Sequence, residues 1–103
     1  MSIEPFSSSI IDASTTVGTS STTLRNACSA RWLLVIHNPS VGTNIAVNFT
    51  GGVAALNTAG SIMIAAGGTM YLDTAIPLGK ITVIAASAAT PVTCYVMERL
   101  PTG

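Results

Sequence analysis

Apolar and polar residues alternate along much of the chain with the two-residue period of β-strands. Residues 31–38 (RWLLVIHN) are rich in branched and aromatic side chains and stop at Pro39, which cannot continue a strand ladder. Both faces of this segment are apolar, which predicts a central strand. Residues 45–49 alternate between large apolar and smaller or polar side chains, and the Gly51-Gly52 turn follows. We therefore expect these two strands to form a hairpin.

Later segments repeat the pattern. Residues 61–64 and 69–72 predict two short strands around a four-residue connection, and residues 80–86 predict another strand. Pro91 is expected to interrupt the strand structure, and a last strand is expected after it over residues 92–99. Turn residues recur about every eight to twelve positions without a helical period. The sequence thus predicts an all-β fold: a small antiparallel β-sandwich or partly open barrel with an extended N-terminal arm.

The N-terminal part differs in character from the rest. Residues 1–24 are mostly small and polar, interrupted by Phe6, Ile10 and Ile11. This composition fits a first strand with a loose arm, or an arm that becomes ordered by adding a strand to a neighbouring subunit. We divide the 103-residue chain into this segment, one sandwich domain over residues 25–100 and a short tail over residues 101–103.

Charged residues are scarce. Four Lys or Arg balance four Asp or Glu, and only 8% of the residues are charged, against about 25% in an ordinary soluble domain. Zero net charge argues against nucleic-acid binding. Polar residues, glycines and prolines interrupt the apolar runs, so no membrane-spanning helix or export signal is expected. The scarcity fits a Ser/Thr/Asn-rich free surface or, as we favour, a surface that other protein covers.

Candidate catalytic chemistry is sparse. Cys28 and Cys94 allow one disulfide, although two reduced, buried thiols are favoured, and His37 is the only histidine. The carboxylates are scattered along the sequence. We expect no catalytic residues, no metal site and no cofactor, and therefore no enzyme.

Three aromatic residues leave a different function open. A shallow sugar-binding face could use Trp32, Tyr71 or Tyr95. At least two of these three side chains, however, are expected in the core.

The order of the segments resembles a known group of proteins. The run 31–40 with its Asn-Pro-Ser turn, the strand 45–49, the Gly-containing corner at 66–68, residues 76–81 and the last strand at 92–98 resemble small β-sandwich proteins and modules of tailed bacteriophage virions. The resemblance covers residues 25–99. At Ala66-Gly67 a Pro-Gly corner is more usual in that group.

The resemblance implies a structural role. Such modules occur as capsid decoration (cement) proteins and in head fibres, and decoration proteins often form trimers on the capsid lattice. It therefore implies a virion protein on the capsid surface, assembled in the host bacterial cytoplasm, with the major capsid protein and further copies of itself as partners. Alternatives are a host-surface glycan recognition module, such as a head-fibre base, and a minor tail or adaptor component.

We also expect residues at subunit contacts. The apolar residues of the N-terminal segment are candidates, and scarce charges are candidates because ionic groups can fix the register of an interface. The expected interface residues are Phe6, Ile10, Ile11, Arg25, Arg31, Glu98 and Arg99.

Overall fold

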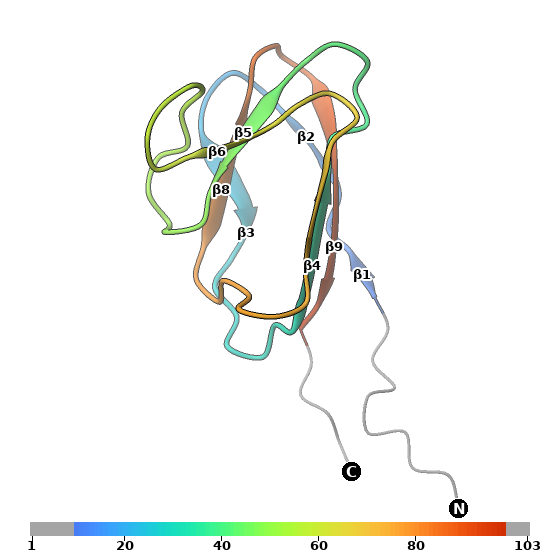
Figure 1. Ribbon diagram of the computed structural model, residues 1–103, viewed down its shortest axis with the longest axis vertical. Helices are drawn as coiled ribbons and strands as arrows, with labels where there is room; N and C mark the ends of the chain where they lie inside the picture. Colours follow the sequence, from blue (N-terminus) through green and yellow to red (C-terminus); the bar gives the residue numbers. More distant parts are fainter. Residues whose placement is uncertain (1–9, 99–103) are drawn as a thin grey trace, which may run out of the picture.

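The computed structural model describes residues 10–98, which form nine β-strands and no helix (Figure 1). In chain order the strands are β1 (Ile11–Asp12), β2 (Thr15–Val17), β3 (Thr22–Arg25), β4 (Leu33–His37), β5 (Ile45–Asn48), β6 (Ile62–Ile64), β7 (Thr69–Leu72), β8 (Ile81–Ala85) and β9 (Thr90–Met97). All of their pairings are antiparallel. The all-β prediction is confirmed.

The strands build two sheets that pack face to face. One has the order β1-β9-β4-β7, with β2 also pairing with β9, and the other has the order β3-β8-β5-β6. In Figure 1 the two layers stand on either side of the molecule. This arrangement is the β-sandwich that the sequence predicts.

The core lies between the sheets, where every second residue of each strand points inward. The middle strand β4 shows the pattern: Leu34 and Ile36 are fully buried in the core, whereas Val35 lies on the outer face and is half-buried. The core comprises Val17, Leu24, Leu34, Ile36, Ile45, Val47, Ile64, Ile81, Val83, Ala85, Val92, Cys94 and Val96. Removal of these side chains from water is the main force that holds the two sheets together.

The expected hairpin between residues 31–38 and 45–49 is wrong. The strands β4 and β5 lie in different sheets, because residues 39–44 carry the chain across the sandwich. Asn38 fixes this crossing: its buried amide donates to the carbonyls of Thr43 at 2.7 Å and Ile64 at 3.1 Å, and its Oδ1 accepts from the Ser40 hydroxyl at 2.8 Å. A turn that spans two layers thus takes the place of a hairpin.

The expected break at Pro91 is also wrong, because β9 runs through it from Thr90 to Met97. Proline is tolerated in a strand where no neighbour needs its missing N–H. Pro91 faces only the short strand β2, at Thr16, and the pairing of β9 with β4 starts at Thr93. The long strand can therefore continue past the proline.

Residues 11–24 are part of the sandwich. Strands β1 and β2 pair with β9, β3 pairs with β8, and Val17 and Leu24 enter the core. For this stretch the first of the two alternatives, a strand of the chain's own sheet, describes the structure. The rest of the expected arm (1–9) and the expected tail (101–103) lie outside the described residues. Within residues 10–98, no helix is long and apolar enough to cross a membrane.

Candidate functional site

Arg31 lies at the centre of a buried cluster at one end of the sandwich. Its side chain is fully buried, and its Nε donates to Glu98 Oε2 at 2.9 Å. Its two Nη atoms donate to the backbone carbonyls of Pro77 and Asn26, each at 2.6 Å, and Nη1 also donates to Gly79 at 3.2 Å. The planar guanidinium therefore joins three separate chain segments, a task that suits its fixed fork of donors.

Arg25 completes the cluster from strand β3. Its Nη2 and Nε donate to Glu98 Oε1 at 2.6 and 3.0 Å, so Glu98 accepts hydrogen bonds from two arginines. Burial alone would raise the pKa of Glu98, but the hydrogen bonds and positive charges of Arg25 and Arg31 outweigh it and hold the pKa below its ordinary value. The bond to Glu98 also raises the pKa of Arg25. Arg25, Arg31 and Glu98 thus form an ionised cluster that joins strand β3 to the end of β9 at one end of the sandwich. We call these three residues the internal tie.

Because these charged residues pair with one another, few charged residues remain for the surface of the described domain. Between residues 10 and 98 the sequence holds six Asp, Glu, Lys or Arg residues, and three of them form the tie. The other three are Asp12, Asp73 and Lys80. Asp12 is exposed, and hydrogen bonds from Ser14 lower its pKa. The exterior of the described domain is consequently almost free of ionic groups.

A row of four residues, two of them tyrosines, crosses the outer face of the β1-β9-β4-β7 sheet. Tyr71 of β7, Val35 of β4, Tyr95 of β9 and Asp12 of β1 are direct cross-strand partners, so their side chains stand on one face. Tyr71 is 63% exposed and Tyr95 is 40% exposed. Adjacent strands lie roughly 4.8 Å apart, which separates the two tyrosines by about 10 Å. We call these four residues the outer row.

The exposure of both tyrosines corrects one expectation. At least two of the three aromatics Trp32, Tyr71 and Tyr95 were expected in the core, but the two tyrosines are exposed and Trp32 is half-buried. The reason is register: Tyr71 and Tyr95 pair with Val35, which faces outward, and not with the inward-facing Leu34 or Ile36. Next to the outer row, His37 Nδ1 lies 2.7 Å from the Thr69 hydroxyl.

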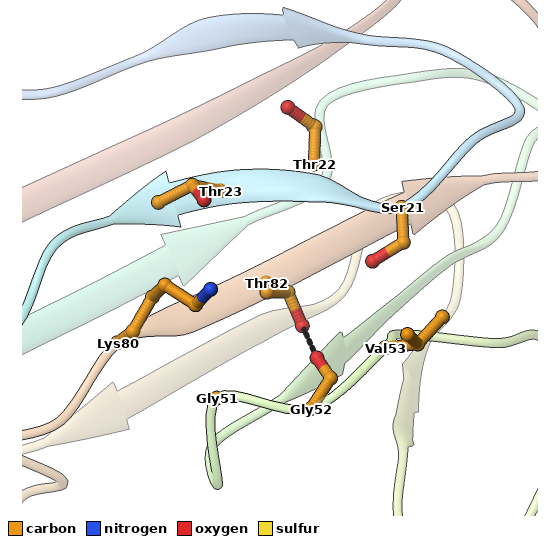
Figure 2. A pocket seen from close by; sticks show the side chains of 8 residues that line it. All are labelled: Ser21, Thr22, Thr23, Gly51, Gly52, Val53, Lys80 and Thr82. Carbon is orange, nitrogen blue, oxygen red and sulfur yellow. Dashed lines mark hydrogen bonds between the residues drawn. The ribbon is translucent and has the colours of Figure 1, made fainter.

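A shallow open pocket of about 280 Å³ lies on the outer side of the other sheet (Figure 2). Two of its hydroxyl groups already have partners: Thr82 donates to the Gly52 carbonyl at 2.6 Å, and Ser21 accepts from the Ala54 N–H at 2.9 Å. These bonds hold the loop after β5 against the sheet. Lys80 is exposed at the pocket. The loop residues Gly51, Gly52 and Val53 thus form one wall of the pocket, opposite side chains of β3 and β8.

The cysteines are free thiols in the structure. Cys94 is fully buried in the core, where burial raises its pKa to about 11, and Cys28 is half-buried. A thiol with a raised pKa is mostly protonated at neutral pH and is a poor nucleophile. Within residues 10–98 no three His, Cys, Asp or Glu side chains come together in a way that could hold a metal ion.

The expected interface residues have different environments. Ile10 and Ile11 remain exposed, at 52% and 39%. Arg25, Arg31 and Glu98 come together, but they bind one another within the chain. The sequence made these three residues candidates because charged residues are scarce. It did not indicate that they pair with one another, because Glu98 is separated in sequence from Arg25 by 73 residues and from Arg31 by 67 residues. Phe6 and Arg99 lie outside the described residues.

Comparisons with known proteins give no relative: no protein-family model, no curated protein and no solved structure matches the chain.

Proposed function

We propose that the chain is a non-enzymatic structural protein of a bacteriophage virion, a decoration protein that oligomerises on the capsid surface and stabilises the shell. The single observation that carries this proposal is the nearly ion-free exterior, on which Asp12, Asp73 and Lys80 are the charged residues of 10–98 outside the internal tie. The resemblance of residues 25–99 to phage β-sandwich modules supports a capsid as the assembly that covers this surface. The major capsid protein and further copies of the chain are the proposed partners.

The physical reason is the cost of burial. Ionic groups lose much hydration free energy when an interface covers them, whereas hydroxyl, amide and aromatic groups lose less and can form new hydrogen bonds. A charge-poor exterior with exposed Tyr71 and Tyr95 can therefore be covered at low cost. On a lattice, many weak contacts add up through multivalent binding. A freely dissolved monomer has no such use for an uncharged surface.

Copy number tests this proposal. Quantitative mass spectrometry of purified particles should give copies of this chain in a fixed ratio to the major capsid protein, as expected of a lattice component. The same particles after removal of the chain should lose their DNA at a lower temperature. A handful of copies per particle would instead assign the chain to a minor tail or adaptor component, and absence from particles would reject the proposal.

The outer row favours a second candidate, a glycan recognition module. Exposed aromatic rings on one flat face can stack on sugars, and Tyr71 and Tyr95 meet this condition. A glycan array with the full chain tests it. Binding that Tyr71→Ala and Tyr95→Ala both abolish, while Val53→Ala on the other sheet's loop leaves it intact, would favour recognition over decoration.

A further inference from the structure

The strands at the four edges of the two sheets are protected to different degrees. Natural sheets protect their edges with charges, bulges or very short strands, because an open edge pairs readily with another chain. Strand β1 carries Asp12, and β1 and β2 are separate strands of two and three residues. Strand β3 carries Arg25 and an irregular register between Thr23 and Arg25. Strand β6 has three residues.

Strand β7 lacks these devices. Its four residues, Thr69–Leu72, contain no charge, no proline and no glycine, and among the described strands it pairs only with β4. The core is also less well sealed on this side. Met70 and Leu72 pack against the core yet remain partly exposed, whereas Val17 and Leu24 on the opposite side are buried. The edge of β7 is thus both open and apolar.

The backbone of β7 has groups that can bind a further strand. The Asn38 N–H donates to the Gly68 carbonyl at 2.9 Å. In an antiparallel pair the residues that bond to a given neighbour alternate, so Met70 and Leu72 direct their backbone groups toward β4. Thr69 and Tyr71 then direct theirs away from β4, toward the open side.

We propose that β7 pairs with β7 of a second copy of this chain, antiparallel and about a two-fold axis at Tyr71. In this register Tyr71 lies opposite Tyr71 of the second copy and both exchange their outward backbone hydrogen bonds. Met70 then faces Leu72 across the contact, which closes the core on this side. The edge is self-complementary in charge, because Asp73 comes opposite Thr69 and the two aspartates lie at opposite ends of the contact.

Two alternative registers, with the axis at Asp73 or at Thr69, use the edge less well. A two-fold axis at Asp73 would place like charges directly opposite each other, which is unfavourable. An axis at Thr69 would bring the turn at Gly67, whose φ is +80°, into the pairing and leave Leu72 uncovered. The register at Tyr71 also places the outer rows of the two copies end to end, with the two Tyr71 side chains adjacent at the centre.

The dimer forms from the isolated protein and does not depend on the virion proposal. Light scattering coupled to size exclusion should show a dimer of about twice 10.4 kDa for the full chain. Tyr71→Lys places two ammonium groups opposite each other and should weaken the dimer at least about tenfold. Tyr95→Lys is the matched control: it adds the same charge to the same face, but β9 is flanked by strands on both sides, so this variant should remain a dimer.

Cysteine cross-linking tests the register. Tyr71→Cys should form a disulfide-linked dimer under mild oxidation, because directly paired residues lie within the Cα separation that a disulfide needs. Thr69→Cys should not, and the unmodified chain gives the background of Cys28. A monomer or a trimer in solution, or a dimer that persists in folded Tyr71→Lys, would overturn the proposal. Copy number in particles reports separately on the virion role.

Discussion

Arg31 is a charged residue that lies inside the fold and contributes nothing to the surface. Its guanidinium makes hydrogen bonds to Glu98 and to three backbone carbonyls, and its side chain has no exposed area. Arg25 shares the same carboxylate but keeps 28% of its side chain exposed. The two arginines therefore differ in how much each one supports the closed end of the sandwich.

Arg31→Ala should destabilise the protein far more than Arg25→Ala. Loss of Arg31 leaves Glu98 less well paired in a buried place and leaves three carbonyls without their donor, which costs about 3–5 kcal/mol. Loss of Arg25 leaves Glu98 bonded to Arg31 and costs about 1–2 kcal/mol. Urea denaturation of both variants measures the free energies of unfolding. Equal losses would contradict the central place of Arg31, and Arg31→Lys, which keeps the charge without the fork, should fall between them.

At the scale of elements, alternation along the sequence located strands β4 to β9 to within a few residues. It did not determine which sheet each strand joins. A strand with an apolar side fits either layer, and the choice between hairpin and crossing depends on the network around Asn38, whose partners Thr43 and Ile64 lie beyond the turn. The sequence also did not predict that Tyr71 and Tyr95 face outward, because tyrosine suits either face of a sheet.

The connection from β6 to β7 also crosses between the sheets, and it contains the closely packed Gly68. A Cβ at Gly68 would lie 2.9 Å from the Ala65 backbone oxygen and 3.2 Å from the Ile64 side chain. Gly68→Ala should therefore cost about 1–3 kcal/mol through forced backbone shifts.

Gly42 offers a matched comparison in another loop. A Cβ there would meet no atom within 4 Å. Gly42→Ala should change the free energy of unfolding by less than about 0.5 kcal/mol. Thermal denaturation of both variants checks the pair, and equal melting temperatures would show that the crossing at Gly68 is looser than the contacts indicate.

At the scale of the whole molecule, the location of charge connects the fold to the proposed role. Half of the charged residues of 10–98 pair with one another at one end of the sandwich, and the outer row and the open edge of β7 lie on a surface whose charged residues are Asp12 at the end of the row and Asp73 directly after β7. Composition alone indicated the scarcity. Only the structure indicates that the exterior is poorer in free charge than the composition implies, because Arg25, Arg31 and Glu98 pair with one another and only Arg25 of the three keeps a sizeable exposed area.

An electron cryo-microscopy map of the intact particle tests the central claim most directly. The account predicts density for this sandwich at repeating positions on the capsid lattice, with the outer row or the β7 edge covered by a neighbour. A map of particles shown to contain the chain, in which that surface faces solvent in every copy, would contradict it.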